Sequence, residues 1–76
     1  MDVIVYSTST CPWCKKTKEW LEENKVKFKD IDVTQNAKAR DEMIDKSGQM
    51  GVPVVMIGDE ILVGFNPDKM KNLLKL

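Results

Sequence analysis

Cys11 and Cys14 are the residues of this sequence best suited to chemistry, and Pro12 and Trp13 separate them. A bridge between the two sulfurs would close too small a loop to restrain the unfolded chain much, so the pair is a poor structural staple. Thiolates attack disulfides, and a second thiol nearby can complete the exchange. The spacing therefore predicts that Cys11 attacks a substrate disulfide and that Cys14 then displaces the reduced substrate.

Metal binding is an alternative explanation of the pair, because cysteines at this spacing are also common ligands of zinc and iron–sulfur clusters. The sequence has no histidine and no third cysteine. A metal or iron–sulfur carrier would therefore need carboxylates, or Cys11 from two chains. A purely structural or interaction domain is a third alternative, and it predicts ordinary thiol reactivity for Cys11.

A second candidate feature is Gly51-Val52-Pro53, which opens an apolar run. Proline removes a donor from a strand, so its natural place is the first residue. A tight approach there can require the cis form, although base rates favour trans. If Val52 lies beside the cysteine loop with a free backbone N–H and C=O, it can pair with a substrate backbone like an added strand.

The elements around the cysteines would position both sulfurs. Val3–Tyr6 reads as a central strand buried on both faces, and a helix is expected from Pro12 to about Asn24. Cys11 then precedes the helix, where unpaired N–H groups and the positive end of the helix dipole favour a thiolate. Cys14, one turn later, should be more buried. The solvent-exposed face of this helix is expected to carry Lys15, Lys16 and Lys18.

Further elements follow in regular alternation, so the predicted order is β-α-β-α-β-β-α. This order indicates one domain over residues 1–76, an α/β fold with a four-stranded mixed sheet flanked by three helices. The expected elements are a strand at Val26–Val33 with a bulge near Lys29-Asp30, a helix at about Ala37–Lys46 capped from Thr34-Gln35-Asn36 and ended by Ser47-Gly48, a hairpin of Val54–Ile57 and Ile61–Val63, and a last helix from Asn66-Pro67 to the C-terminus.

Composition narrows the function classes. Twelve basic and twelve acidic residues give a net charge of zero, which argues against nucleic acid or a membrane surface as partner. The start, Met1 to Tyr6, lacks the basic residues and long apolar stretch of a secretory signal, so we expect a cytoplasmic protein. Nothing in the sequence demands more than a monomer.

Taken together, these residues resemble the glutaredoxin family. The resemblance rests on the strand Val3 to Tyr6, on Thr10-Cys11-Pro12-Trp13-Cys14 followed by lysine, on Gly51-Val52-Pro53 and on Gly64. The segment from Ser47 to Val54 looks closest to the YruB-like branch. The resemblance implies a thioredoxin fold, a cis Pro53, Cys11 as nucleophile and Cys14 as resolving thiol. It also implies disulfide-containing proteins or small molecules as substrates.

The electron source is left open between glutathione and thioredoxin reductase. Glutaredoxins that use glutathione often carry a basic residue before the motif, a threonine before the Val-Pro pair and acids after a Gly-Gly pair. Here these positions read Thr8, Gly51 and Val63–Asp68. Gly64-Phe65-Asn66-Pro67-Asp68 is similar to a segment of NrdH-redoxins, which take electrons from thioredoxin reductase. Asn66 can cap the last helix and present N–H groups to a carboxylate.

We therefore expect no tightly bound cofactor and, at most, glutathione as a co-substrate. Residues on three segments are expected to bind substrate: Pro12, Trp13, Val52, Pro53, Gly64, Phe65 and Asn66.

Overall fold

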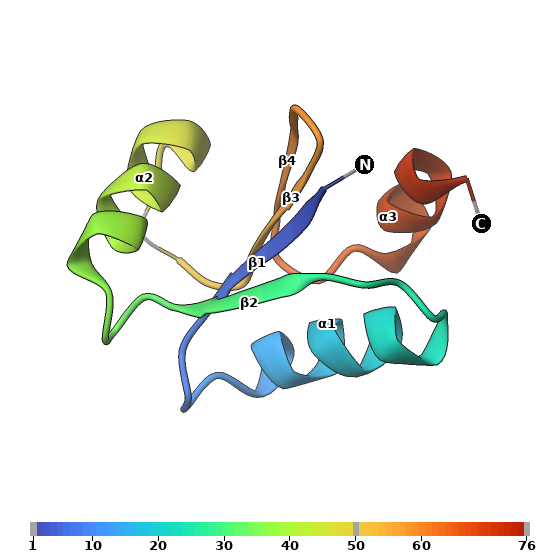
Figure 1. Ribbon diagram of the computed structural model, residues 1–76, viewed down its shortest axis with the longest axis horizontal. Helices are drawn as coiled ribbons and strands as arrows, with labels where there is room; N and C mark the ends of the chain where they lie inside the picture. Colours follow the sequence, from blue (N-terminus) through green and yellow to red (C-terminus); the bar gives the residue numbers. More distant parts are fainter. Residues whose placement is uncertain (1, 50, 76) are drawn as a thin grey trace.

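A computed structural model describes residues 2–49 and 51–75 of the chain (Figure 1). Over these residues the chain forms four strands and three helices in the predicted order. The elements are β1 (Val3–Ser7), α1 (Pro12–Glu23), β2 (Lys29–Asp32), α2 (Ala37–Ser47), β3 (Val54–Ile57), β4 (Glu60–Val63) and α3 (Pro67–Leu74).

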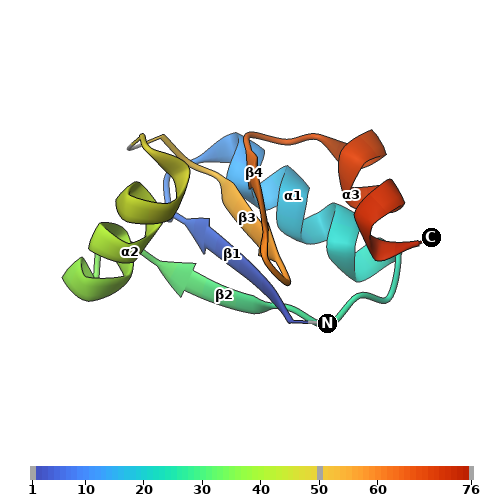
Figure 2. The ribbon, with the colours of Figure 1, turned by 90° about the horizontal axis from the view of Figure 1, so that it is seen from above.

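The strands form one mixed sheet in the order β2-β1-β3-β4 (Figure 2). β1 runs parallel to β2 and antiparallel to β3, and β3 pairs antiparallel with β4. A parallel pair needs a crossover, which α1 supplies, whereas β3 and β4 are joined by a short hairpin turn. This arrangement confirms the predicted α/β class and mixed sheet.

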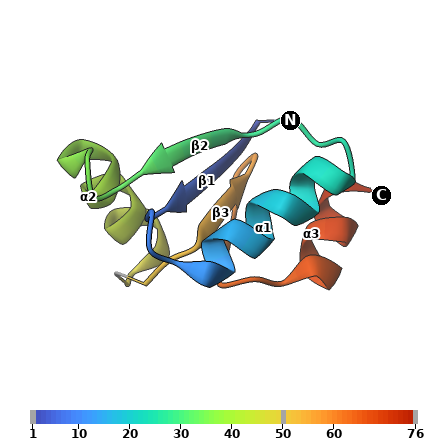
Figure 3. The same ribbon diagram turned by 90° about the horizontal axis from the view of Figure 1, so that it is seen from below.

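Helices cover both faces of the sheet. α1 and α3 lie over one face (Figure 3), where Leu21 and Met70 pack against the strands, and α2 covers part of the other face through Ala39 and Met43. β1 is buried on both sides as predicted, since its neighbouring residues Val5 and Tyr6 belong to opposite cores. The sheet therefore fixes β1, whose end leads directly into the cysteine loop.

The second strand is the element that sequence reasoning placed least well. It covers Lys29–Asp32, not Val26–Val33. The predicted bulge near Lys29-Asp30 is wrong, because pairing with β1 runs from Ile4–Lys29 to Ser7–Asp32 without interruption. Phe28 packs in the core under α1, and Ile31 packs in the core under α2. The alternation of apolar and charged residues appears interrupted because the side chains of this segment pack on both faces of the sheet.

Boundaries elsewhere shift by a residue or two. α1 ends at Glu23 with Asn24 as its cap, and α3 ends at Leu74. α2 extends through Ser47 and ends at Gly48, whose φ of 73° lies in the left-handed region that favours glycine. β4 starts at Glu60, one residue before the prediction.

Asparagine side chains cap the starts of α2 and α3. The side-chain oxygen of Asn36 accepts a hydrogen bond from the N–H of Ala39 at 3.0 Å. The side-chain oxygen of Asn66 accepts one from the N–H of Lys69 at 3.2 Å. Both contacts satisfy backbone donors that a helix start leaves unpaired.

Candidate active site

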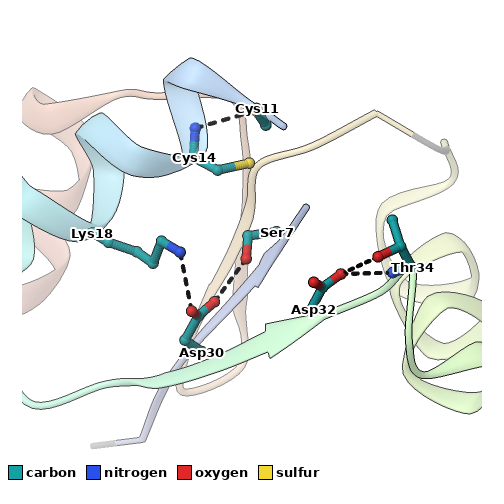
Figure 4. Close-up of polar contacts among 7 residues, drawn as sticks. All are labelled: Ser7, Cys11, Cys14, Lys18, Asp30, Asp32 and Thr34. Atoms are coloured by element: carbon teal, nitrogen blue, oxygen red, sulfur yellow. Dashed lines mark hydrogen bonds and ion pairs between the residues drawn. The ribbon is translucent and has the colours of Figure 1, made fainter. Parts of the chain in front are cut away.

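Cys11 occupies the N-cap of α1, directly after the loop that leaves β1. Its N–H donates to the carbonyl of Thr8, and its Sγ accepts a hydrogen bond from the N–H of Cys14 at 3.2 Å (Figure 4). Pro12 is the first residue of the helix, where its missing donor costs nothing. The first turn of α1 contains no acidic residue. The Cys11 sulfur therefore lies where a helix start favours negative charge.

Cys14 lies one turn into α1 and is completely buried, whereas Cys11 is partly exposed. Both thiols are free. Burial raises the pKa of the Cys14 thiol to about 12, and its hydrogen bond with Cys11 acts in the same direction. A backbone hydrogen bond with Thr8 and the charge of Lys18 act to lower that pKa. The pair thus combines a reachable sulfur with a sheltered one, as the helical spacing predicted.

Val52 and Pro53 lie beside the cysteine loop. The thiol of Cys11 faces the carbonyl oxygen of Val52 at 3.8 Å, and the Val52–Pro53 peptide bond is cis, as the family resemblance implied. The carbonyl of Pro53 accepts the N–H of Gly64 at 2.8 Å. Among the hydrogen bonds of residues 2–49 and 51–75, none involves the N–H of Val52. Within this part of the chain, the N–H of Val52 is therefore free to pair with a substrate, as the sequence analysis required, whereas its C=O faces the Cys11 thiol.

The side chain of Gln49 fixes the backbone of Gly51, which lies just before the cis Val52–Pro53 peptide bond. Its amide oxygen accepts the N–H of Gly51 at 2.6 Å, and its amide nitrogen donates to the carbonyl of the same residue at 3.0 Å. A side chain at position 51 would meet the Gln49 oxygen, since an added Cβ would lie 2.6 Å from it. Glycine at position 51 therefore leaves room for the Gln49 side chain to make both hydrogen bonds.

Five of the predicted substrate-binding residues line one open pocket beside the cysteines. This groove has a volume of about 260 Å³, and its lining is Trp13, Val52, Pro53, Gly64 and Phe65. The rings of Trp13 and Phe65 lie 6.1 Å apart between centroids, and Trp13 is 56% exposed. The Nζ of Lys16 lies 4.9 Å from the centre of the Trp13 ring. The groove offers apolar and aromatic surface next to Cys11.

Two predicted binding residues lie outside the lining of this groove. Pro12 is exposed at the first position of α1, and the Asn66 side chain is engaged as the N-cap of α3. A larger open pocket, of about 490 Å³, lies where β1 and β2 begin and is lined by Asp2–Ile4 and Lys27–Lys29. The smaller groove is the better candidate site, because it is lined by Val52, whose carbonyl faces the Cys11 thiol, and by Trp13 from the cysteine motif.

Sequence reasoning missed a set of linked polar contacts beneath α1. Ser7 Oγ donates to Asp30 at 2.7 Å, and Lys18 Nζ forms an ion pair with the same carboxylate at 3.0 Å (Figure 4). Lys18 had been assigned to the wet face of the helix, yet its side chain is only 28% exposed. Its position four residues after Cys14 was the available signal, because residues at that spacing share a helix face.

Comparison with known proteins decides the family. The glutaredoxin family model matches residues 3–62. The chain belongs to the glutaredoxin family. This chain is 48% identical over 71 residues to a glutaredoxin-like 8.6 kDa protein in the rubredoxin operon of Clostridium pasteurianum, covering 93% of this chain and 95% of that protein. It is 35% identical over 63 residues to glutaredoxin 3 of Escherichia coli K12, covering 83% and 76% of the two chains.

A solved structure supports the same assignment. The glutaredoxin-like protein NrdH-redoxin from Escherichia coli superposes with a TM-score of 0.85 at 32% identity, covering 96% of this chain and 95% of that one. The thioredoxin fold expected from the sequence is therefore confirmed. The family resemblance is confirmed as well, and it makes this protein a member of a family of thiol oxidoreductases.

Within residues 2–49 and 51–75, no three side chains of the types His, Cys, Asp and Glu gather as a metal site. Across the same part of the chain, no helix is long and apolar enough to cross a membrane.

Proposed function

We propose that this protein reduces disulfides of proteins or small molecules by a dithiol mechanism. The observation that carries the proposal is the pairing of a partly exposed Cys11 at the N-cap of α1 with a buried Cys14 whose N–H contacts the Cys11 sulfur. A nucleophile must reach its substrate, whereas a resolving thiol needs only to reach the first sulfur. The two environments therefore suit different roles.

In the first step, the Cys11 thiolate attacks one sulfur of the substrate disulfide. A bond forms between Cys11 and that sulfur, the substrate S–S bond breaks, and the other substrate sulfur leaves as a thiolate that takes up a proton. In the second step, Cys14 loses its proton and attacks Cys11. The remaining substrate sulfur leaves and is protonated, so the protein becomes oxidised and the substrate gains two electrons.

The groove would hold the substrate during these steps. Trp13 and Phe65 would supply apolar surface next to Cys11. The N–H and C=O of Val52 would pair with the extended backbone on one side of the substrate disulfide, as in strand addition. Pro53 and Gly64 would complete the floor of the groove, while Asn66 would act indirectly by beginning α3.

Either glutathione or thioredoxin reductase would restore the dithiol, and no tightly bound cofactor is needed. Thr8, Gly51 and Asn66 offer no charged side chain at the positions where glutathione-using relatives often have one. The aligned NrdH-redoxin from Escherichia coli has a thioredoxin-like activity profile, which makes thioredoxin reductase a concrete candidate. The proposed role suits a monomer in the cytoplasm, where thiols are kept reduced.

A coupled assay tests the proposal. Reduction of a model disulfide is followed by NADPH oxidation, once with glutathione plus glutathione reductase and once with thioredoxin reductase. We expect turnover with at least one system and complete loss in Cys11→Ser. Cys14→Ser should still form the Cys11 mixed disulfide, which intact mass spectrometry detects. Disulfide reduction by Cys11→Ser would refute the mechanism, and the active reductant identifies the electron source.

A further inference from the structure

Ser7, Lys18 and Asp30 come from β1, α1 and β2 and meet on the side of the sheet that α1 covers. The Asp30 carboxylate accepts a hydrogen bond from Ser7 Oγ at 2.7 Å through one oxygen and contacts Lys18 Nζ at 3.0 Å through the other. Ser7 is buried. These contacts hold the Lys18 ammonium under the helix, where a free lysine side chain would normally extend into water.

The same arrangement places the Lys18 side chain on the side of α1 that carries the resolving thiol. Cys14 and Lys18 are four residues apart on α1, so they occupy one face of the helix. Figure 4 shows both side chains below α1, on the side of β1 and β2. The charge of Lys18 opposes the effect of burial on the pKa of the Cys14 thiol.

The other groups facing Cys14 do not supply a positive side chain. Cys11 and the backbone of Thr8 contact it from the loop. On this face of the sheet, β1 presents Val3, Val5 and Ser7 and β3 presents Val55 and Ile57, and none of these side chains is charged. Asp30 from β2 is an acid, and Lys18 already contacts it. Lys18 is therefore the cation best placed to act on this sulfur.

We propose that Lys18 is a positioning residue for the second step, held by Asp30 and Ser7 so that its ammonium stabilises the thiolate forming on Cys14. This inference rests on the proposed function. When Cys14 attacks Cys11, its proton passes to water, the bond between Cys11 and the substrate sulfur breaks, and the departing thiolate takes up a proton. Lys18 forms no bond and keeps its protons throughout.

The test separates the two steps. The Cys11 mixed disulfide of the wild-type protein is generated with a chromophoric disulfide, and each thiol release is timed by stopped flow. A nearby positive charge favours an anion, and partial exposure weakens the effect, so Lys18→Met should slow the second release about three- to tenfold at neutral pH. Lys18→Arg should retain the wild-type rate. Lys38→Met, an exposed lysine on α2, removes the same charge elsewhere and should change neither step.

A merely structural role would give a different pattern. Loss of helix packing would slow both releases, and arginine, with its larger head group, would not restore the rate. Either of these patterns, or an unchanged second release in Lys18→Met, would overturn the inference.

A second measurement keeps this test independent of the proposed function. In the Cys11→Ser background, the carbon NMR shift of the Cys14 Cβ reports ionisation of that thiol. Lys18→Met should move the rise of this titration to higher pH, and Lys18→Arg should restore it. If the wild-type protein releases no thiol at all, the proposed function fails while this titration still decides the role of Lys18. An unchanged titration would overturn the inference.

Discussion

At the scale of single residues, the environments of two thiols separate two roles. Cys11 is the partly exposed N-cap of α1 and faces the carbonyl of Val52, whereas Cys14 is enclosed by protein and ionises with difficulty. The accessible Cys11 sulfur can therefore attack a substrate disulfide, whereas the sheltered Cys14 sulfur can attack only Cys11. The order of the two steps follows from this difference.

Protonation of Cys14 also links folding to pH. The pKa of the thiol is raised from 9.0 to about 12 in the folded protein, so the native state keeps a proton that the unfolded state loses. Stability from this group is complete below about pH 9 and falls as pH rises, by at most about 1.4 kcal/mol per pH unit. Urea unfolding of the reduced protein between neutral pH and about pH 10 measures this slope.

Cys14→Ser is the control for that slope. Tyr6, whose pKa is raised by burial and then by Glu42, titrates in the same direction in both proteins. We therefore expect a shallower loss of stability in Cys14→Ser, and equal slopes would contradict the assignment of the pKa shift to Cys14.

Much of the site could be predicted from residue types and spacing alone. The cysteine roles depend on one helical turn, and Val52-Pro53 is set by the place of proline at a strand start. The link between Lys18 and Asp30 could not be predicted, because it depends on the register that places Asp30 opposite Val5. A lysine on a helix gives no sign of its partner until the neighbouring strand is aligned.

At the scale of elements, the start of α3 supports one wall of the groove. Asn66 caps this helix directly after Phe65, which packs against the core and faces Trp13. Asn66→Ala should reduce the free energy of unfolding by about 1 kcal/mol, since a backbone donor loses its partner. Asn66→Ser keeps a capping oxygen and should retain most of that stability in denaturant unfolding.

Activity measurements on the same variants separate capping from binding. If Asn66 acts only as a cap, Asn66→Ser should have the KM of the wild-type protein for the model disulfide. A higher KM in Asn66→Ser at unchanged stability would instead return Asn66 to the substrate-binding residues predicted from the sequence.

Element order was predictable because hydrophobic runs and helix caps are local signals. The extent of β2 was not, since it depends on pairing with β1. Val26 and Phe28 contact the core without joining the sheet, and their apolar character extended the predicted strand. In β1 the residues that pack in the core are also paired with neighbouring strands. Val26 and Phe28, just before the edge strand β2, pack against the core without such pairing.

At the scale of the whole molecule, two small cores share one sheet. A domain of 76 residues buries a smaller fraction of its surface than a large one, so each core residue carries a large share of the stability. Leu21 of α1 and Met43 of α2 lie in different cores. Neighbouring residues of β1 and of β3 point into different cores. Because the two cores share these strands, they should unfold together.

Leu21→Ala tests this coupling. Removing the buried side chain should cost about 2–5 kcal/mol, because transfer and cavity terms add. Met43→Ala supplies the matched change on the opposite face. Helix content followed by circular dichroism and tryptophan fluorescence, which reports on α1, should give coincident urea transitions in both variants. A fluorescence transition displaced by Leu21→Ala but not by Met43→Ala would show that the α1 face unfolds separately, and the cysteine pair could then open while the rest of the sheet stays folded.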